Sequence, residues 1–329
     1  MKNYIFEPVT KKQAISMCND NRIKHINVTI KNCTKELKDG FSVKFVNKLL
    51  TNNNNTKISI SLDRIFSEDE IEYVKKLLEK INLEKVQYVF YSDLAIHEIL
   101  QERNYQNKLV YDAYTYLTNY MDVNAYLTFN ENVVVSNQIS VQEIENLLNN
   151  VNKPVIIHGF GKSVIFYSKR KLMKNYFKYR RFLKNPYKKS YYLQEEYRDG
   201  YYHIYENKFG TSIYEKDYYY LFSELEKFNN VDEVMIHSAD LKAKEYNAIV
   251  EAYLTNDENK LKALKYEVGK GIMSTTSILL KDGKQKIGRA HVWTPVTFRS
   301  RMPSSAWKKK DNYTICNIYV VHFDNLLEF

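Results

Sequence analysis

Two histidines that follow buried-type strands are the strongest candidates for chemistry in this sequence of 329 residues. His158 follows the apolar run 154–157, and His237 ends the run 231–237. A neutral imidazole accepts or donates a proton near pH 7, so a histidine at a strand end suits general acid–base catalysis. We expect the His158 ring to point into an exposed mouth, with Gly159 leaving room for a ligand. The alternative is a histidine that only packs at its strand end.

Acidic side chains at the ends of other expected strands complete the candidate catalytic set. Asp112 ends the fifth expected strand, and Glu206 lies in a segment that we expect to cover the mouth. Imidazole and carboxylate groups are common zinc ligands, so Asp112 could share an ion with the histidines, but we predict no metal site. Asp63, Asp93 and Ser136 also end strands, and each is equally suited to cap the next helix. The catalytic candidates are His158, Glu206, His237 and Asp112.

A basic and aromatic segment, the arm (162–189), follows the first histidine. It holds eleven Lys or Arg, seven aromatic residues and no acid. Aromatic side chains stack on bases while Lys and Arg contact phosphates, so this composition favours single-stranded RNA as a partner. Arginine also offers a two-pronged grip on a phosphate or carboxylate. The alternative is an ordinary solvated face. The ligand-binding candidates in the arm are Lys169, Arg170, Tyr176, Arg180 and Arg181.

The end of the chain changes how the charge is interpreted. The formal net charge is +10, which by itself favours a nucleic-acid partner. Residues 287–297 and 300–310, however, resemble a common DNA sequencing adapter translated in one frame, with Trp293 and Trp307 at its TGA codons. Some bacterial lineages read UGA as Trp, so we expect a bacterial source. Removing the six basic residues of 287–310 from +10 leaves about +4, and the basic character is local to the arm.

Alternating strands and helices must position these residues. Strand-type runs recur seven times up to residue 157 and once more at 231–237. Amphipathic helices separate most of them, such as the helix opened by the capping motif at 67–70. This alternation predicts an α/β fold with a parallel sheet, and eight units predict a closed (β/α)8 TIM-like barrel. The alternative, an open doubly wound sheet, has no GxGxxG motif to support it.

We expect the chain to divide into three parts. A barrel domain covers 1–255, interrupted by an irregular basic and aromatic insert at 160–230 between the last two strands. Residues 256–286 form a C-terminal extension, and 287–329 form an artefactual tail. Gly210 marks a turn between irregular strands of the insert.

The cysteines and the hydropathy pattern predict a compartment. Cys18, Cys33 and Cys316 are widely spaced and form no CxxC pair, which is typical of a reducing cytoplasm. No apolar run approaches the ~20 residues of a membrane span. We therefore predict a cytoplasmic protein with no membrane partner.

Several segments near the histidines are similar to those of a known family. Residues 157–159 (IHG), 168–170 (SKR) and 175–177 (NYF) resemble the signature region of the collagenase-like peptidase family, peptidase family U32. Residues 194–198 and 204–211 resemble its Glu-Glu-x-Arg and Pro-Ile-x-Glu-Asp-x-x-Gly-Thr segments. The similarity extends over about 1–255 and fits the short, barrel-only bacterial branch. The resemblance implies ligand-binding roles for Glu196, Arg198 and Thr211.

The family resemblance implies two kinds of activity. Collagen degradation is attributed to some members, and others assist in hydroxylating RNA bases or a quinone ring, several with a [4Fe–4S] cluster held by four cysteines. This chain departs from the pattern, because Lys162 and Lys171 stand near the positions of family cysteines and Asn207 replaces an acid. His237 likewise stands where the family has an Asp. A cluster needs four thiolates, so we predict no iron–sulfur cluster and no other cofactor.

Three functions remain open from the sequence. The first is assistance in RNA modification, specifically hydroxylation of a tRNA uridine, with RNA bound by the arm and a paralogous U32 protein as a further partner. The second is a collagenase-like protease, although the sequence has no HExxH or GxSxG motif. The third is a degenerate, non-catalytic binding scaffold, which the replaced cysteines and acids favour. The candidate catalytic residues lean towards an enzyme.

Overall fold

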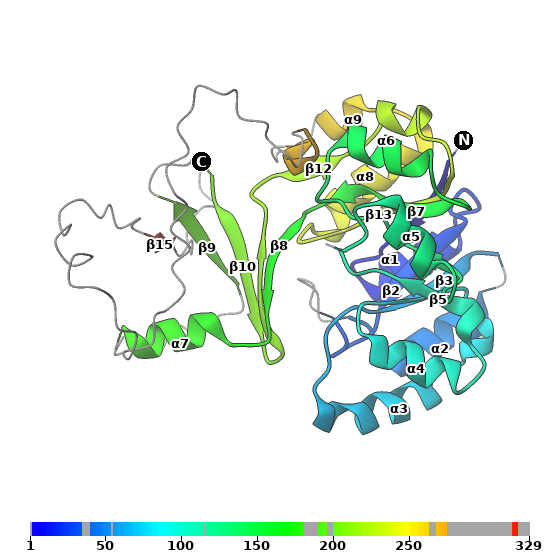
Figure 1. The fold of residues 1–329 in the computed structure, drawn as a ribbon, viewed down its shortest axis with the longest axis horizontal. Coiled ribbons are helices and arrows are strands. Elements are labelled where there is room, and N and C mark those ends of the chain that lie inside the picture. The colour runs from blue at the N-terminus through cyan, green and yellow to red at the C-terminus, as the bar shows by residue number, and fades with distance from the viewer. Residues whose placement is uncertain are drawn as a thin grey trace.

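The computed structural model describes residues 2–34, 40–53, 55–114, 116–180, 190–195, 200–262, 268–274 and 318–321. Figure 1 shows a larger body, in which helices surround strands, and a smaller antiparallel sheet that extends from one side of it. The smaller sheet, here called the insert sheet, is built mainly from the predicted insert 160–230. The adapter-like residues 287–310 lie outside the described residues.

Eight parallel strands form the centre of the larger body. Their order is β7-β13-β1-β2-β3-β4-β5-β6, and each neighbouring pair is parallel. Just beyond β6, a parallel bridge joins Val134 to Ile156 of β7, and the Val135 N–H donates to the Ile156 carbonyl at 2.9 Å. The strands are β1 (Asn3–Phe6), β2 (His25–Thr29), β3 (Lys57–Leu62), β4 (Val89–Tyr91), β5 (Leu109–Tyr111), β6 (Asn132–Val133), β7 (Val155–Gly161) and β13 (Val231–Ile236). This arrangement confirms the predicted α/β class.

Helices follow most of these strands and cover the outside of the sheet (Figure 1). They are α1 (Lys11–Cys18), α2 (Val43–Asn52), α3 (Ile71–Glu79), α4 (Leu94–Gln101), α5 (Tyr120–Tyr126), α6 (Val141–Leu148), α8 (Ala243–Thr255) and α9 (Asn259–Lys262). Short 3-10 turns occupy η1 (Glu68–Glu70), η2 (Leu83–Lys85), η3 (Gln106–Lys108), η4 (Ser223–Glu226) and η5 (Gly271–Ser274). Ser140 and Glu143 form a capping box that begins α6, as the sequence predicts.

The described part of the arm, 162–180, supplies one strand of the insert sheet and a helix, two elements that the sequence alone could not separate. The order of the insert sheet is β15-β9-β10-β11-β8, with antiparallel neighbours. The strands are β8 (Val164–Ser168), β9 (Ser190–Glu195), β10 (Tyr202–Asn207), β11 (Gly210–Tyr214) and β15 (Ile318–Val321), and α7 (Leu172–Tyr179) follows β8. A Cβ on Gly210 would lie 2.2 Å from the Ser168 carbonyl oxygen, so the turn into β11 requires glycine. The arm therefore begins as a strand followed by a helix.

Two short strands extend the main sheet beyond β7. They are β12 (Tyr218–Tyr220), antiparallel to β7, and β14 (Val268–Gly269), parallel to β12. β15 comes from the predicted artefactual tail and pairs with β9, while the rest of that tail lies outside the described residues.

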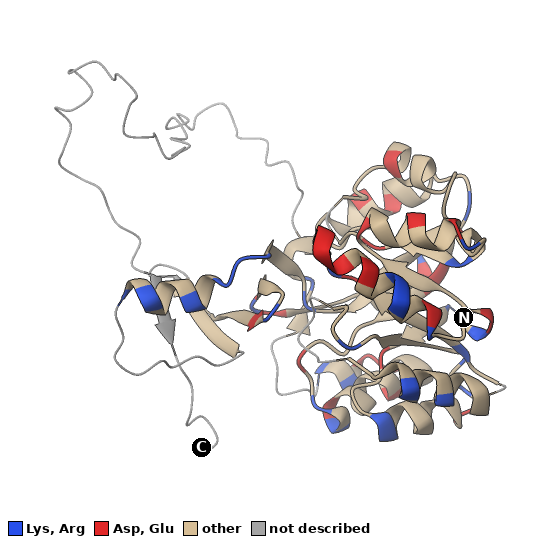
Figure 2. Cartoon of the chain, turned by 90° about the horizontal axis from the view of Figure 1, so that it is seen from below, with Lys and Arg blue, Asp and Glu red and all other residues tan. Residues whose placement is uncertain are grey.

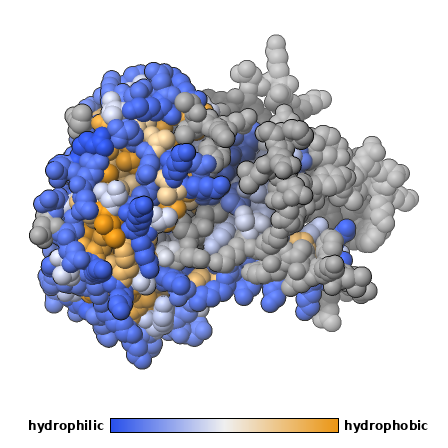
Figure 3. Space-filling view, turned by 180° about the vertical axis from the view of Figure 1, so that it is seen from behind, coloured by the Kyte–Doolittle hydropathy of each residue, from blue (hydrophilic) through white to orange (hydrophobic). Residues whose placement is uncertain are grey.

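The surface of the larger body mixes apolar and charged groups. Figure 3 shows one face on which apolar patches are enclosed by hydrophilic side chains. Across the described ranges, no helix combines the length and apolar character that crossing a bilayer requires.

Candidate functional site

Three side chains from neighbouring strands form a hydrogen-bonded array, here called the strand-end array. The Nδ1 atom of His158 lies 2.7 Å from Nε2 of His237, and Nδ1 of His237 lies 3.1 Å from Oε1 of Glu7. These residues belong to β7 or directly follow β13 and β1, which are adjacent in the sheet. Because parallel strands end at the same edge, the sequence brings both predicted histidines together there.

The array fixes where protons lie. A carboxylate accepts hydrogen bonds, so the Nδ1–H of His237 donates to Glu7. When both imidazole rings are neutral, Nε2 of His237 is an acceptor and Nδ1–H of His158 donates to it. The Nε2 atom of His158 then carries the lone pair of that ring. A proton taken up there can pass along the array, because the Glu7 carboxylate stabilises an imidazolium at His237.

Both rings of the array are buried, which corrects the expectation of an exposed mouth. His158 is 2% exposed and His237 is 5% exposed. The Tyr114 ring stacks on His158 with 5.7 Å between centroids, and it also lies 6.4 Å from His237. Covering side chains exclude water, so hydrogen bonds within the array are stronger than they would be at a surface.

Tyr114 itself has an unusual backbone. Its φ angle is +62°, a left-handed conformation that is costly for a bulky side chain. Ala239, two residues after His237, also has a positive φ of +43°. Two such residues beside one array mark a place where surrounding packing imposes strain, as is common at functional sites.

Tyr114 separates the array from open space. It lines a small cavity of about 20 Å³ that His237 and Lys162 also line. It lines a second cavity of about 310 Å³, bounded by residues of β8 such as Val164 and Phe166. A ligand in the larger cavity therefore reaches His158 only if the Tyr114 side chain moves.

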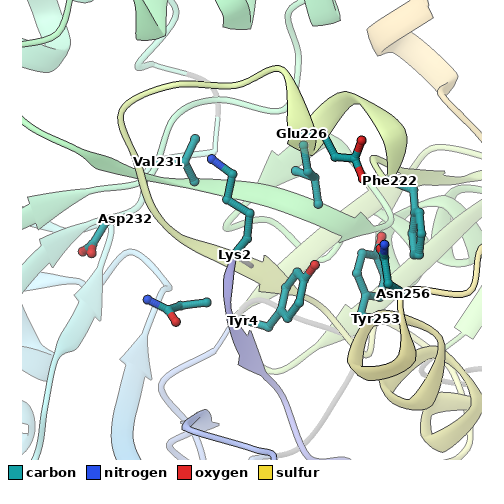
Figure 4. A pocket seen from close by; sticks show the side chains of 10 residues that line it. Lys2, Tyr4, Phe222, Glu226, Val231, Asp232, Tyr253 and Asn256 are labelled. Carbon is teal, nitrogen blue, oxygen red and sulfur yellow. The ribbon is translucent and has the colours of Figure 1, made fainter.

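A cavity of about 580 Å³ lies at the opposite end of the parallel strands, where β1 and β13 begin (Figure 4). Its lining includes Lys2, Tyr4 and Tyr253 and contains none of the predicted site residues. Burial is the main factor that raises the pKa of Tyr4 in this lining. We assign the site to the strand ends despite the smaller cavities there, because the strand-end array provides acid–base groups in mutual contact.

The remaining strand-end acids differ from one another: Asp93 caps a helix, whereas Asp112 and Asp63 are buried at the ends of their strands. Asp93 caps α4, since its Oδ1 accepts from the Ala95 N–H at 3.0 Å, which confirms that alternative. Asp112 and Asp63 are 3% exposed and lie at the ends of β5 and β3. Ser136 donates to the Tyr114 carbonyl at 2.6 Å and so helps to fix its unusual backbone.

Gly159 has a different role from the one expected. A Cβ at this position would lie 2.4 Å from Cγ1 of Val234 and 3.0 Å from Cδ1 of Ile236. β13 packs into the space that we expected a ligand to use. The strand also continues past His158 to Gly161, so His158 lies within β7 and does not end it.

Glu206 lies in the insert sheet and not at the strand-end array. Its carboxylate is fully buried and accepts from the N–H groups of Met173 at 2.7 Å and Lys174 at 3.1 Å. The Thr211 Oγ1 atom lies 2.6 Å from this carboxylate and 2.8 Å from the Arg170 carbonyl oxygen, and its single proton is donated to one of these two acceptors. A carboxylate that accepts from the first turn of α7 stabilises this helix, so the geometry gives Glu206 and Thr211 a structural contact.

Most charged residues in the described part of the arm, 162–180, are exposed to solvent, whereas the Lys162 side chain is buried beside Asp240. Figure 2 marks Lys and Arg positions along α7 in blue, away from the larger body. Lys169, Arg170 and Arg180 are exposed, as are Tyr176 at 36% and Tyr179 at 82%. Three other ligand-binding candidates, Arg181, Glu196 and Arg198, lie outside the described residues.

Two members of the site were not selected from the sequence. Glu7 follows β1 just as His237 follows β13, and the strand-end rule places it at the same edge, but it was not chosen as a catalytic candidate. Tyr114 follows β5 by three residues, and no sequence pattern marks its positive φ.

The donor set does not fit the iron–sulfur cluster that the resemblance raises. Four thiolates are required, and the chain has three cysteines. Cys18 and Cys33 are buried, and burial raises their pKa to about 11 and about 12, which disfavours thiolates. The Nζ atom of Lys162, which by resemblance stands near a family cysteine position, lies 3.6 Å from Oδ2 of Asp240. Among the described residues, no group of three His, Cys, Asp or Glu is arranged to hold a metal ion.

The fold and the site together define an α/β protein with acid–base groups at the carboxyl ends of parallel strands. The model of peptidase family U32 matches residues 24–265, which is most of the chain. The chain belongs to peptidase family U32.

Two solved structures resemble the chain at low sequence identity. The U32 peptidase Mk0906 matches with 13% identity and a TM-score of 0.45, covering 73% of this chain and 94% of that one. A mutant tryptophan synthase alpha-subunit from Pyrococcus furiosus matches with 12% identity and a TM-score of 0.39, covering 79% and 95%. No curated protein matches the chain.

Proposed function

We propose that this U32-family protein assists in modifying an RNA base, with the strand-end array supplying proton transfer. The observation that carries the proposal is the contact between Glu7, His237 and His158. Here a carboxylate, one imidazole and a second imidazole lie in series, which is the arrangement expected of a general base whose charge is stabilised from behind.

The arm supports RNA as the ligand. Tyr176 and Tyr179 are exposed on α7, beside Lys174, Lys178 and Arg180. Exposed aromatic rings stack on bases, and neighbouring cations contact phosphates. We take a tRNA uridine as the substrate from the family resemblance.

Hydroxylation also needs an oxidant, which the acid–base groups of this chain do not provide. We therefore propose that this chain binds RNA and moves protons, while a paralogous U32-type partner supplies the redox chemistry. No redox step is assigned to residues of this chain.

Two further proposals concern the fold and the compartment. The Val134–Ile156 bridge supports a closed (β/α)8 barrel, because it connects the two outer strands of the eight-strand series. Buried, free Cys18 and Cys33 support a reducing compartment, for which we propose the bacterial cytoplasm.

The alternatives are a collagenase-like protease and a non-catalytic scaffold. A non-catalytic scaffold is less consistent with the site. His237 stands where the resemblance places an Asp in the family, and yet it forms the centre of the strand-end array. A hydrolytic activity has separate support in the insert sheet, where a serine contacts a buried histidine.

The test is nucleoside analysis of tRNA from cells that carry only the variant protein. His158→Gln and His237→Gln should each lower the modified nucleoside at least ~100-fold, because glutamine does not exchange a proton near pH 7. His97→Gln is the matched control, since His97 is another buried histidine but lies on α4. Unchanged modification in His158→Gln, with the protein folded, would exclude the proposed role.

A further inference from the structure

A serine, a histidine and an aspartate form a second array, which joins the insert sheet to the larger body. Nε2 of His203 lies 2.5 Å from Oγ of Ser190, and Nδ1 of His203 lies 2.9 Å from Oδ2 of Asp240. Ser190 begins β9, His203 lies on the paired strand β10, and Asp240 follows β13. No sequence motif marks this array, because 13 and 37 residues separate the contacting partners.

Several contacts hold the histidine and the aspartate in place. The Tyr192 ring stacks on His203 with 4.9 Å between centroids and an angle of 17°. Tyr218 donates to Oδ1 of Asp240, and Nζ of Lys162 lies 3.6 Å from Oδ2. Burial would raise the pKa of Asp240, but His203, Lys162 and Tyr218 together hold it well below its ordinary value. The aspartate is therefore ionised at neutral pH.

An ionised aspartate determines the protons of the other two residues. Asp240 accepts from Nδ1–H of His203, so Nε2 of the neutral ring carries the lone pair. That lone pair accepts the hydroxyl proton of Ser190. This is the order of contacts in serine hydrolases, where the base takes the serine proton and the acid orients the base.

Exposure distinguishes Ser190 from an internal serine. Ser190 is exposed, whereas His203 is 4% exposed and half-buried Asp240 lies behind it. Ser190 is thus the member of the array with the greatest exposure to solvent. A nucleophile at the surface with a base and an acid buried behind it is the arrangement that acyl transfer requires.

We propose that Ser190, His203 and Asp240 form a hydrolytic site for carboxylic esters or amides, separate from the strand-end array. The Ser190 oxygen attacks the carbonyl carbon as its proton passes to Nε2 of His203. The bond to the alcohol or amine breaks, and the leaving group takes that proton. Water then attacks the acyl-serine and gives a proton to His203, the Ser190–acyl bond breaks, and the proton returns to the Ser190 oxygen as the acid departs.

The test is labelling of the purified full chain with a fluorophosphonate probe, without RNA. The Ser190 oxygen bonds to phosphorus, fluoride leaves, and the serine proton passes to His203. We expect the label on the tryptic peptide 190–198. Ser190→Ala should abolish labelling there, and His203→Gln should slow it by roughly 100- to 10,000-fold. Asp240→Asn should slow it within the same range.

Matched controls separate chemistry from folding. Ser168→Ala removes another serine of the same sheet, whose Oγ accepts from the Arg170 N–H, and it should leave labelling unchanged. Circular dichroism checks that each variant is folded. Absence of label on Ser190 in the folded wild-type protein overturns the proposal, as does equal labelling of His203→Gln. Because RNA is absent, either result leaves the tRNA nucleoside test independent.

Discussion

The two ends of the parallel strands each hold a buried histidine array, but the arrays have different surroundings. At the end where the strands begin, Nδ1 of His25 lies 2.8 Å from Glu233, and its Nε2 lies 2.6 Å from Ser59. His25 and Ser59 are fully buried, and Ser59 also accepts from the Tyr88 N–H at 3.0 Å. Each polar group there has protein partners. At the other end, the array lies beside a strained tyrosine and a cavity.

This difference teaches that contacts alone do not identify a site. Ser59, His25 and Glu233 have the same order of contacts as a hydrolase triad, yet they are closed to any substrate. The two arrays differ in their immediate neighbours, because His237 lines a cavity together with Tyr114, whereas none of Ser59, His25 and Glu233 lines the cavity of about 580 Å³ at their own end. A buried network without access serves stability and uniqueness of the core. We therefore expect changes at the first end to affect stability and changes at the second to affect function.

The largest expected effect is at His25. Replacing His25 with Ala leaves the Glu233 carboxylate buried without its partner, which costs about 3–5 kcal/mol. Urea unfolding followed by circular dichroism measures this change in the free energy of unfolding. A cost below ~1 kcal/mol would contradict the structural role that we assign to this end.

A smaller decrease in stability is expected at the strand-end array. His158→Gln removes a buried hydrogen bond to His237 and the stacking on Tyr114, which costs about 1–3 kcal/mol. This cost in the free energy of unfolding is higher than the cost of the same replacement at an exposed histidine. The same urea experiment compares this variant with His25→Ala. A cost equal to that of His25→Ala would remove the contrast between the two ends.

The pH dependence of the free energy of unfolding tests the ion pair between Arg64 and Glu70. The hydrogen bond from the buried Arg64 lowers the pKa of Glu70 to about 2. A lowered pKa stabilises the folded state above the ordinary range near 4.5, and this contribution disappears as the pH falls towards 2. Glu70→Gln should therefore be less stable than wild type by on the order of 1 kcal/mol at pH 7, with little difference near pH 2. A constant difference across that range would contradict the ion pair.

The smallest expected effect on the fold is in the arm. Replacing Lys169, Arg170, Arg180 and Arg181 with Ala should leave the melting temperature almost unchanged, because the three that are described are exposed. The salt dependence of RNA binding should flatten by about 0.7 in log–log slope for each phosphate that is no longer neutralised. Titrations at several salt concentrations measure this slope, and an unchanged slope would mean that the arm is only a solvated face.

Strong local patterns predicted much of the fold. The runs that became β3 and β7 and the capping motif that begins α6 are visible in the sequence, because period and caps are local properties. α5 was missed, since it is short, buries only Val123 among its residues and depends on the Asn119 cap. The arm was also undivided, because antiparallel pairing of β8 with β11 is a long-range contact.

The site was predicted less completely than the fold. His158 and His237 were found because parallel strands end together, a rule that requires no side-chain detail. Glu206 was placed wrongly over the mouth, since its true partner is the start of α7. The pairing of His25 with Glu233 and of His203 with Asp240 depends on packing between distant segments, which a single sequence does not reveal.

The short segment 237–240 carries one member of the strand-end array and one member of the array formed by Ser190, His203 and Asp240. His237 contacts Glu7 and His158, and Asp240, three residues later, contacts His203. A ligand that displaces Asp240 therefore shifts the backbone that also holds His237. Thermodynamic linkage makes such coupling reciprocal, so occupancy at Ser190 and protonation at His158 would each change the free energy of the other. The segment 237–240 thus links the two proposed chemistries through four residues of the chain.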